Sequence, residues 1–597
     1  MSSFKYRSDI TGLRAIAVLP VLFFHSKVPF FSGGFLGVDV FFVISGFLIT
    51  GIIINEIQGN RFSLFGFYDR RIRRIIPVLL FVTICTTILS FFFMLPYDLK
   101  NYGESLVAVI LSANNILLYL TSGYWSLSSE FKPLYHTWSL GVEEQYYLIM
   151  PILIVMVLRI SKLNTKVLAA ILFLLICLSF FLSLLHDNKE FVFLMLFTRA
   201  WELLVGSMLA IVIKNLNVRK NSYLPIIGIC FLVLSYVNPY IVSDNLALVM
   251  AMPVLGTTLI ILFSDQKCFV GKLLSSRPLF FIGLISYSIY LWHQPILSFL
   301  RLASEYEPSW TKQILYALAS IPLAYFSWRY IENPFRSKKI FNSKKIYIIV
   351  CSFALTILAL GLILYKSYGF SFLWPKLSYN SSNPQAYVDN PRRFKQSSFN
   401  TEDNNVLVLG SSYARDFINM MSENQLLRKY NIIYYEGSCN LEGKIDSLKL
   451  LDFLNSSDYV VLAGYWGATS DEGADWVQSC YGELSRNTHG KVFVLGTKNF
   501  GWNNNFVKWL PRESLYKHRV RPLKTVSSFN KKARNTIRSH YIDLIGLLSD
   551  TQGKLPIFTD KNTFITYDTS HLTPDGARYV GGLLFKHHPE ILGLRSN

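Results

Sequence analysis

Residues 11–29 read TGLRAIAVLPVLFFHSKVP, and this stretch indicates how the first half of the chain folds. Most of it is apolar, and with Lys5 and Arg7 as a polar flank it is long enough to cross a bilayer as a helix. Arg14 and His25 are eleven positions apart, so in a helix they share one face, about 16 Å apart along the axis. Because an arginine within hydrocarbon is costly, this face is expected to line a bundle interior or a polar path. The alternative is an Arg14 that snorkels to the headgroups and a His25 that is an ordinary core residue.

The composition of the 597-residue chain separates a membrane part from a soluble part. Hydrophobic residues make up 51% of the chain, and apolar runs of helical length recur as far as Tyr365 and then stop. From Lys366 onward the composition is that of a soluble domain large enough for its own core. The net charge of +20 does not point to nucleic acid, because much of it lies in short loops between apolar segments. The first span has no small-residue cleavage site, so we expect it to be retained and not removed as a signal peptide.

The basic loops predict how the apolar segments cross the membrane. Twelve segments are candidates: 12–30, 35–55, 75–95, 104–120, 140–158, 167–186, 193–213, 223–241, 246–264, 278–300, 312–332 and 346–366. Lys and Arg mark loops that stay in the cytoplasm, and they recur in every second loop only if one segment does not span. Segment 104–120 is the weakest, since it holds Asn114 and Asn115, and we place it as a re-entrant or surface element. The prediction is a polytopic α-helical membrane domain of about eleven spans, with a cytoplasmic N-terminus and an extracytoplasmic C-terminal domain.

The domain organisation follows from these segments. Residues 1–340 are predicted to form a membrane domain with ten spans, and residues 341–366 an additional tethering span without buried charge. Residues 367–404 are rich in Ser, Asn and Pro and are predicted to be a linker or a loosely ordered extension. Residues 405–597 alternate short apolar runs with helical stretches, and we expect buried strands at 406–410, 431–436, 459–464 and 491–496. This alternation of strands and helices predicts a three-layer α/β domain with a parallel sheet.

Ionisable residues within the predicted membrane domain fall into two groups. Arg71 and Arg74, in YDRRIRRIIP, lie at the cytoplasmic start of the third span, level with Arg14. Guanidinium groups there suit a ligand with several phosphates. The alternative is that these arginines, like others in cytoplasmic loops, only orient the protein in the membrane. Towards the outer side, HTWSLGVEEQYY holds Glu143 inside a span, where its carboxylate needs a partner, and His25 is the candidate. Further such residues are His136, Glu144, His293 and the pair Arg199 and Glu202, which we expect to be a structural ion pair.

Two short motifs in the C-terminal domain suggest nucleophilic catalysis. The first predicted strand ends in Gly410-Ser411-Ser412, which places a hydroxyl at the strand-to-helix turn, next to helix N–H groups that can stabilise an oxyanion. Near the C-terminus, YDTSHLTPDG holds Asp568 and His571 three residues apart, so the carboxylate can orient the imidazole. Together these supply the nucleophile, base and orienting group of a catalytic triad. The alternative for Asp568 and His571 is a chance pair in a loop.

The cysteines point to one disulfide and to no metal site. Of the seven cysteines, Cys439 and Cys480 fall in the predicted outer domain, and the other five are Cys85, Cys177, Cys230, Cys268 and Cys351. An oxidising exterior favours a Cys439–Cys480 disulfide. No His or Cys spacing indicates a metal ligand set.

Several motifs between residues 7 and 335 occur in the order typical of one family. They are GLRAIAV with the following FFH, GVDVFFVISGFLI, FYDRRIRRIIP, TWSLGVEEQYY and ISYSIYLWH. This ordered set resembles the acyltransferase-3 family of integral membrane O-acyltransferases. The resemblance implies that cytosolic acyl-CoA, usually acetyl-CoA, acylates extracytoplasmic carbohydrates or other hydroxyls. It also implies that Arg14, Arg71 and Arg74 hold the CoA end, that His25 is the essential histidine and that Glu143 is its partner.

Residues 405–590 resemble the SGNH/GDSL-type esterases and acyltransferases. The resemblance implies that Ser412 is the nucleophile and that Asp568 and His571 complete the triad. Two departures matter: Ser411 stands where the family has Asp, so Ser411 remains a second possible nucleophile, and Gly464-Tyr465-Trp466-Gly467 lacks the oxyanion-hole Asn. The hole would then be built from backbone N–H groups, for instance those of Ser412 and Gly437, or from another side chain.

The two resemblances together are those of bacterial O-antigen and other surface-glycan O-acetyltransferases. They predict an enzyme of the bacterial inner membrane that passes acetyl from cytosolic acetyl-CoA to hydroxyls of a periplasmic glycan, either polysaccharide or lipid-linked oligosaccharide. Lipopolysaccharide O-antigen is the expected acceptor, membrane lipids surround the spans, and no nucleic acid is involved. Three alternatives are an anchored glycan esterase, a transporter or flippase for an acylated lipid-linked sugar, and an outer domain that only binds its ligand.

Overall fold

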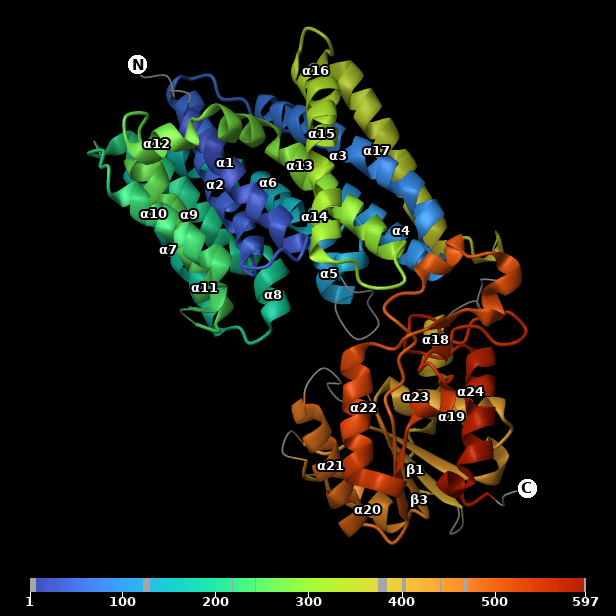
Figure 1. The fold of residues 1–597 in the computed structure, drawn as a ribbon. Coiled ribbons are helices and arrows are strands. Elements are labelled where there is room, and N and C mark those ends of the chain that lie inside the picture. Colours follow the sequence, from blue (N-terminus) through green and yellow to red (C-terminus); the bar gives the residue numbers. More distant parts are fainter. Residues whose placement is uncertain are drawn as a thin grey trace. The chain divides into compact units, whose positions relative to one another are not determined.

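The computed structural model describes residues 7–121, 129–216, 218–241, 243–373, 384–399, 404–440, 443–445, 447–464 and 471–594. The chain divides into two units (Figure 1). The helical unit comprises Met1–Phe92, Leu99–Arg301 and Pro308–Lys366. The α/β unit comprises Ser367–Asn597 and two short segments, Phe93–Asp98 and Leu302–Glu307.

The described residues of the helical unit form helices and connecting loops, and none of them forms a strand. Their bounds are α1 Ser8–His25, α2 Gly37–Gln58, α3 Leu64–Phe93, α4 Pro96–Ile110, α5 Asn114–Thr121, α6 Thr137–Ile160, α7 Thr165–Leu185, α8 Lys189–Leu194, α9 Leu196–Asn215, α10 Leu224–Val237, α11 Leu246–Phe263, α12 Phe269–Leu274, α13 Arg277–Leu302, α14 Trp310–Leu318, α15 Ser320–Ser327, α16 Asn333–Arg336 and α17 Ser343–Lys366. The predicted span 312–332 is therefore several short helices in succession, since α14 and α15 are followed by a π-helical turn, Trp328–Glu332.

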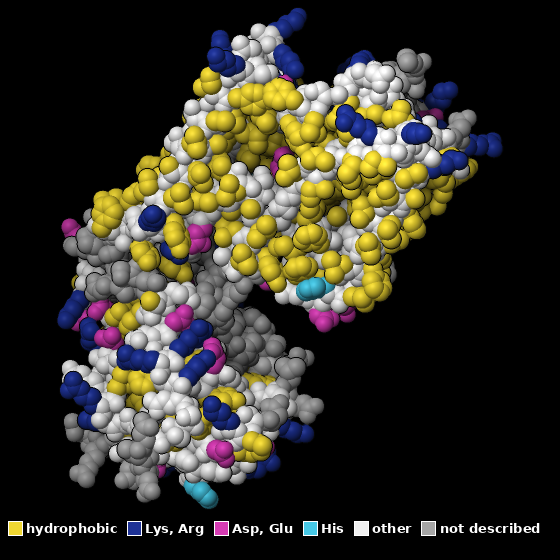
Figure 2. Space-filling model, turned by 180° about the vertical axis from the view of Figure 1, so that it is seen from behind, with side chains coloured by type: hydrophobic (Ala, Val, Ile, Leu, Met, Phe, Trp, Pro, Cys, Tyr) yellow, Lys and Arg dark blue, Asp and Glu magenta, His cyan; other side chains and the backbone are white. Residues whose placement is uncertain are grey.

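Eight helices in the described residues are long and apolar enough to cross a membrane, by length and composition. They lie at α1, α2, α3, α6, α7, α9, α11 and α17. Large apolar side chains are exposed on them, for example Phe173, Leu174 and Phe181 of α7, and Figure 2 shows hydrophobic side chains over most of the visible face of this unit. Such a surface is stable only in contact with lipid or protein. The unit is that of a multi-pass membrane protein, and the count of eleven spans and the orientation stay predictions.

Segment 104–120, which we expected not to span, is broken in the structure. Helix α4 ends at Ile110 and α5 begins at Asn114. The two asparagines are fully buried: Asn114 Nδ2 donates to Thr137 Oγ1 over 2.8 Å, and Asn115 Nδ2 donates to the Leu194 carbonyl over 3.1 Å. The two NH₂ groups are thus paired with neighbouring helices, as burial away from water requires, whereas Asn114 Oδ1 has no hydrogen-bond partner among the described residues.

Helices α2 and α9 approach each other most closely at two glycines. A Cβ added at Gly46 would lie 1.8 Å from the Leu203 carbonyl oxygen, and one added at Gly206 would lie 2.0 Å from that of Val43. Small residues allow such backbone contact between helices in a membrane. This contact fixes α2, which carries residues of both cavities described below.

The α/β unit contains a five-stranded sheet in the order β2-β1-β3-β4-β6, and every adjacent pair is parallel. The bounds of its strands are β1 Asn405–Gly410, β2 Asn431–Glu436, β3 Tyr459–Ala463, β4 Lys491–Leu495 and β6 Tyr541–Ile542, and β5 Arg519–Val520 pairs with β7 Leu555–Pro556 in a separate ribbon. The helices are α18 Pro384–Asp389, α19 Ser412–Glu423, α20 Leu448–Asn455, α21 Asp471–Arg486, α22 Lys524–Ile537, α23 Leu544–Leu548 and α24 Pro574–His587.

The layers of this unit confirm the predicted three-layer arrangement. Helices α19 and α24 pack together on one face of the sheet, and α21 and α22 pack together on the other (Figure 1). The four predicted strands are all present, and β1 is buried along its whole length, as its unbroken apolar sequence requires. The fifth strand, β6, was missed because only two residues pair.

The predicted linker 367–404 differs from the structure in one part. Residues 384–394 form α18 and a 3₁₀ turn, Asn390–Phe394, and both pack against α19. Asn419 Nδ2 donates to the Tyr387 carbonyl over 3.2 Å, and Asp389 pairs with Arg415 over 3.5 Å. The polar composition indicated a linker, but these contacts make the segment part of the α/β unit.

The predicted disulfide between Cys439 and Cys480 is present, with the two Cα atoms 5.7 Å apart. It joins the segment after β2 to α21, across 41 residues of sequence.

Candidate functional sites

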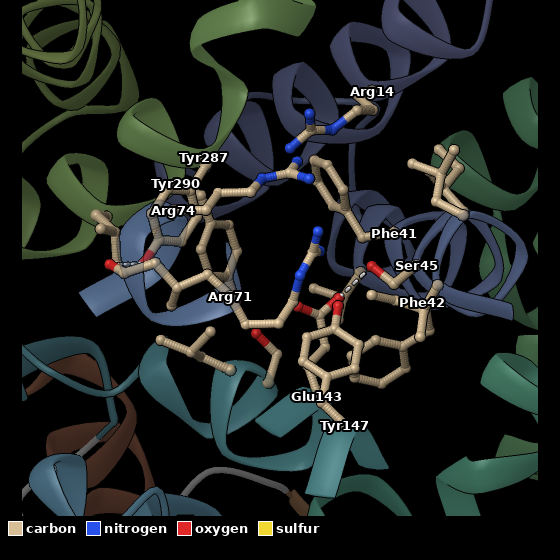
Figure 3. Close-up of a pocket in the computed structure, with 18 residues that line it drawn as sticks. Arg14, Phe41, Phe42, Ser45, Arg71, Arg74, Glu143, Tyr147, Tyr287 and Tyr290 are labelled. Atoms are coloured by element: carbon tan, nitrogen blue, oxygen red, sulfur yellow. Dashed lines mark hydrogen bonds between the residues drawn. The ribbon is translucent and has the colours of Figure 1, made fainter. Parts of the chain in front are cut away.

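One cavity of the helical unit, about 90 Å³ in volume, is lined by three arginines from two helices. Arg14 comes from α1, and Arg71 and Arg74 come from the first turns of α3. In Figure 3 their guanidinium groups turn towards the same space, between α1, α3, α6 and α13. We call this the arginine cavity. Its remaining lining is Val38, Phe41, Phe42, Ile44, Ser45, Leu48, Ile49, Ile75, Ser139, Leu140, Glu143, Tyr147, Tyr287, Tyr290 and Leu291.

The charges around the arginine cavity favour an anionic ligand. Arg14 lies within electrostatic reach of Arg74 and Glu143, and Ser45 Oγ donates a hydrogen bond to Glu143 Oε1 over 2.7 Å. Arg71 Nε is buried without a hydrogen-bond partner among the described residues. Three cations therefore face one carboxylate in the lining. Just beyond the lining, Glu144, Glu332 and Arg336 also lie within electrostatic reach, so the whole cluster carries one positive charge in excess, and uncompensated buried charge is costly. Phosphate groups, which a guanidinium binds through two parallel hydrogen bonds, would supply the missing negative charge.

The predicted pair of His25 and Glu143 is not formed. Glu143 lines the arginine cavity, whereas His25 lines a different one, and no contact between the two appears among the described residues. The residue of this segment that lines the same cavity as His25 is His136. Glu143 lies seven residues beyond His136, about 10 Å further along the axis of α6, and is therefore too far along the helix to share that cavity. Assigning both residues to one half of a span was too coarse to predict a contact.

This second cavity has a volume of about 770 Å³ and is lined by several groups that can transfer protons or bind a polar ligand. They include His25 at the end of α1, His136 just before α6, and Tyr290 and Gln294 of α13. We call it the histidine cavity. Its other charged lining residues are Lys27, Glu130, Lys132, Lys189, Glu190 and Arg301.

Two imidazoles, those of His25 and His136, line the histidine cavity, and a third, that of His293, lies beside them. The ring of His293 lies 5.3 Å from that of His25 and 5.5 Å from that of His136, centre to centre. His293 Nδ1 lies 2.6 Å from the Tyr290 carbonyl oxygen, which can only accept, so Nδ1 carries the proton and Nε2 is an acceptor. His293 Nε2 and both nitrogens of His136 are buried without hydrogen-bond partners among the described residues. Such unpaired groups cost about 1–3 kcal/mol each, and a bound ligand would satisfy them.

Arg301 holds the end of α1 at this cavity, a role that its sequence position did not suggest. Its Nη2 donates to the backbone carbonyl of His25, and its Nε donates to Gln313 Oε1 over 3.1 Å. The arginine therefore fixes the backbone of His25 and not its ring.

The expected ion pair of Arg199 and Glu202 is present, and a third residue joins it. Arg199 Nε lies 3.2 Å from Glu202 Oε1, and Arg199 Nη1 lies 3.3 Å from Asp39 Oδ1. All three are fully buried, and the guanidinium also lies over the rings of Phe42 and Trp138, 5.2 and 5.6 Å from their centres. The cluster ties α2 to α9, which supports its expected structural role. Asp39 in the apolar motif GVDV was the available signal for it.

In the α/β unit, the structure brings Ser412, His571 and Asp568 together. Ser412 Oγ lies 2.9 Å from His571 Nε2, and His571 Nδ1 lies 2.6 Å from Asp568 Oδ2. Ser412 is the first residue of α19, directly after the turn at Gly410 and Ser411, and Gly410 has φ +130°, which favours glycine. The hydroxyl thus stands at the carboxyl edge of the sheet and at a helix N-terminus. This is the geometry of nucleophile, base and orienting group.

The Asp568 carboxylate is held in its charged form. Burial by itself raises its pKa, but the neighbouring His571 and the backbone N–H groups of Ser570 and His571 bring the pKa below its ordinary value. The two N–H groups donate to Asp568 Oδ1 over 3.0 and 2.8 Å, so Oδ2 is left to His571. The carboxylate is therefore an acceptor fixed towards the imidazole.

The geometry also separates the two serines that the sequence left open. Ser412 Oγ contacts the imidazole, whereas Ser411 Oγ is buried without a hydrogen-bond partner among the described residues. Of the stretch in which we sought an oxyanion-hole Asn, Tyr465, Trp466 and Gly467 lie outside the described residues, so the hole predicted from Ser412 and Gly437 N–H groups stays a prediction.

A buried ion pair next to the triad was missed by sequence reasoning. Lys498 Nζ lies 2.7 Å from Asp416 Oδ2, and both side chains are at most 1% exposed. The ammonium group lies 3.7 Å from the ring centre of Tyr413, whose hydroxyl donates to the Lys498 carbonyl over 3.1 Å. Burial lowers the pKa of Lys498, while Asp416 opposes that shift. Asp416 lies one turn after Ser412 on α19, which was the only signal in the sequence.

Comparison with known proteins identifies the two units. Residues 7–329 match the family described as "Acyltransferase domain", and residues 382–586 match the "SGNH domain (fused to AT3 domains)". The first match covers more than half of the chain, so the chain belongs to this acyltransferase family, and its α/β unit carries the SGNH domain.

Two curated relatives are similar over part of their length. The chain is 34% identical over 359 residues to "Peptidoglycan O-acetyltransferase OatA" of Listeria monocytogenes, with 57% of each chain covered. It is 32% identical over 369 residues to "O-acetyltransferase OatA" of Staphylococcus aureus, with 57% of this chain and 58% of the relative covered. The matched part thus spans a little over half the length of these relatives.

Proposed function

We propose that this protein is a membrane O-acetyltransferase that moves acetyl groups from cytosolic acetyl-CoA to hydroxyls of an extracytoplasmic glycan. The observation that carries the proposal is the convergence of Arg14, Arg71 and Arg74 on one cavity within the matched acyltransferase region. The names of the two relatives, both O-acetyltransferases, support the same reaction.

The arginine cavity would bind the phosphates of acetyl-CoA from the cytoplasmic side. This orientation follows from the loop charges of the sequence, which put Arg71 and Arg74 in the cytoplasm and the α/β unit in the periplasm. Glu143 would then balance the arginines and set the shape of the anion site, since Ser45 fixes its carboxylate there. This role replaces the partnership with His25 that the sequence suggested.

His25 would act at the acyl-transfer step as general base. The thioester C–S bond breaks, a C–O bond forms to the hydroxyl of a first acceptor that carries the acetyl group outward, and the hydroxyl proton passes to His25 and finally to the CoA thiolate. A base of this kind must be neutral when it acts, and the histidine cavity places His25 beside His293 and Arg301, an environment that disfavours a further positive charge. General base catalysis of this type contributes about 10²–10⁴-fold.

Ser412 would carry a transient acetyl ester between the hydroxyl acylated at the helical unit and the glycan. Ser412 Oγ attacks that first ester, whose C–O bond breaks and whose oxygen takes the proton back from His571, and a glycan hydroxyl then displaces Ser412 in the same way. His571 would take the proton of the Ser412 hydroxyl, and Asp568 would hold the imidazole in the required tautomer. The same serine, histidine and aspartate would serve an esterase. A function as glycan esterase is the second candidate, and this geometry favours it equally when the α/β unit is considered alone.

The acceptor is proposed to be a cell-envelope polysaccharide. The sequence resemblance favours the O-antigen of lipopolysaccharide, whereas the name of the Listeria relative specifies peptidoglycan. Both polymers are therefore assayed in the experiment below.

The experiment measures label from acetyl-CoA in surface glycan fractions, using cells or vesicles that contain the full chain. His25→Ala and Ser412→Ala are compared with His489→Ala and Ser485→Ala, which replace exposed residues of the α/β unit. Loss of labelling in both site variants at normal protein levels supports the relay. An active Ser412→Ala with an inactive His25→Ala would remove the serine ester from the mechanism. Absence of labelled glycan with the unmodified chain would contradict the transferase function.

A further inference from the structure

The arginine cavity and the histidine cavity share part of their walls. Val38 and Tyr290 line both cavities. Val38 lies in the first turn of α2 and Tyr290 in the middle of α13, so the shared wall is formed by two side chains from different helices.

The contacts of Tyr290 tie this wall to both cavities. Its hydroxyl lies 2.7 Å from the hydroxyl of Ser139, which lines the arginine cavity, and donates to the His136 carbonyl over 2.9 Å. On the other side its ring lies 5.4 Å from that of His136 and 5.3 Å from that of His293. Its own carbonyl fixes the tautomer of His293. Tyr290 thus joins the polar groups of the two spaces.

Unpaired polar atoms lie on both sides of the shared wall. Arg71 Nε on one side and both His136 nitrogens on the other are buried without hydrogen-bond partners among the described residues, and so is Nε2 of the neighbouring His293, which lies outside the lining of both cavities. Each such atom indicates a ligand or water that completes it. One ligand that reaches both sides would account for Arg71 Nε and the His136 nitrogens.

The volumes and charges fit an elongated ligand with one anionic end. The arginine cavity, about 90 Å³, has room only for a few phosphate-sized groups, whereas the histidine cavity, about 770 Å³, lies in the range of small-molecule sites. An acyl-CoA has this form, because its phosphates and its thioester stand at opposite ends of a long flexible arm. The thioester must come within about 3–3.5 Å of the attacking atom to react.

We propose that Val38 and Tyr290 line the passage through which the thioester arm of the donor reaches the histidine cavity, and that they thereby set which acyl chains are accepted. This inference rests on the proposed function, because it assumes an acyl-CoA donor. The transfer step itself is the one written above and needs no additional reactant.

The first test blocks the passage in the full-length protein. Val38→Phe should lower acetyl transfer by about 100-fold and should lower binding of free CoA by less, because Val38 lines both cavities whereas the arginines hold CoA. Val233→Phe, on an exposed position of α10, is the matched control and should leave both unchanged. Equal loss of CoA binding and transfer in Val38→Phe, or transfer at the unmodified rate, would overturn the proposal.

The second test widens the passage and does not depend on how Val38→Phe folds. Val38→Ala should raise the ratio of butyryl to acetyl transfer by about 10-fold or more, since pocket volume discriminates acyl chains by steps of this size. Tyr290→Phe should change this ratio in the same direction, with Tyr316→Phe, on an exposed position of α14, as its control. An unchanged ratio in both variants would overturn the passage even where acetyl transfer is normal. If the unmodified chain transfers no acyl group from any acyl-CoA, the proposed function fails instead.

Discussion

The two candidate acyl-transfer histidines are held in different ways. His571 of the α/β unit is fixed at both nitrogens, by Asp568 at 2.6 Å and by Ser412 at 2.9 Å. His25 of the helical unit has no carboxylate contact among the described residues, and its neighbours are the His293 ring and Arg301, which binds its backbone carbonyl. In the first site, the contacts among the three triad residues form without a ligand. In the second site, buried nitrogens of His136 and His293 have no hydrogen-bond partner in the part of the chain that the structure describes.

The difference follows from where the partners lie in the chain. Asp568 and His571 are three residues apart in one loop, and Ser412 stands at a strand-to-helix turn, so local geometry sets most of the α/β site. The partners of His25 come from α13 and from the start of α6, and they meet only through helix packing. In a preorganised site, replacing an orienting group should lower the reaction rate strongly. In a site that its ligand completes, replacing a residue should first weaken substrate binding.

The largest expected effect is that of Asp568→Asn. It removes the charge that orients His571, and in a triad of this kind the expected loss is about 10⁴-fold. The measurement is the rate at which a fluorophosphonate probe labels Ser412 in the full chain. The exposed Asp475→Asn is the control, since its carboxylate is 63% exposed and pairs with Lys532 at the surface.

The same assay sharpens the comparison between the two sites. Glu143→Gln and His25→Ala should leave the labelling of Ser412 unchanged, because both residues line cavities of the helical unit. A labelling rate in Asp568→Asn within tenfold of the unmodified chain would mean that the α/β site is not preorganised in the way described.

A smaller effect is expected from the buried ion pair of the α/β unit. Lys498→Met leaves Asp416 as an unpaired buried charge, which should cost about 3–5 kcal/mol of the free energy of unfolding. The double variant Lys498→Met with Asp416→Leu should recover most of this loss, because an apolar pair of similar volume replaces the ion pair. Denaturant unfolding of the full chain, followed through probe accessibility of Ser412, measures both.

The exposed pair of Lys532 and Asp475 provides the matched control. Lys532→Met should change the free energy of unfolding far less, since surface ion pairs contribute little. If Lys498→Met proved as mild as this control, the buried pair would not be a stabilising element.

The smallest expected effect concerns acid. The pKa of Asp568 is lowered in the folded state, so its charge stabilises the fold above about pH 4, its value in an unfolded chain. That stabilisation should be lost as pH falls through the lower, folded-state pKa. The stability difference between the unmodified chain and Asp568→Asn should therefore be constant from neutral pH to about pH 5 and shrink in stronger acid. A difference that already vanishes near pH 6 would show that the carboxylate is not held in its charged form.

The sequence predicted the features that depend on neighbouring residues. Apolar length predicted the helices of the membrane part, and alternation of apolar runs with polar helices predicted the parallel sheet. The pattern Asp568-x-x-His571 and the hydroxyl after β1 predicted which groups would meet. The arginines were predicted to meet because each lies near the cytoplasmic end of its span, so all of them lie at the same depth in the membrane.

The sequence did not predict contacts that depend on helix rotation and level. It paired His25 with Glu143, but about 10 Å along α6 separates Glu143 from His136, which lines the histidine cavity with His25. It also treated residues 384–394 as linker, because their packing on α19 leaves no trace in local composition.

By itself, then, the sequence determined a membrane-spanning helical part, a separate α/β domain and the chemical groups of both sites. It could do so because the length of an apolar run, the pattern of a strand and the type of a residue can each be read from a short continuous stretch of sequence. Only the tertiary structure decided that Ser412 and not Ser411 contacts His571, that Lys498 pairs with Asp416, and that Val38 and Tyr290 lie between two cavities. These contacts join distant segments, and the angle and register at which helices pack fix them within a few ångströms.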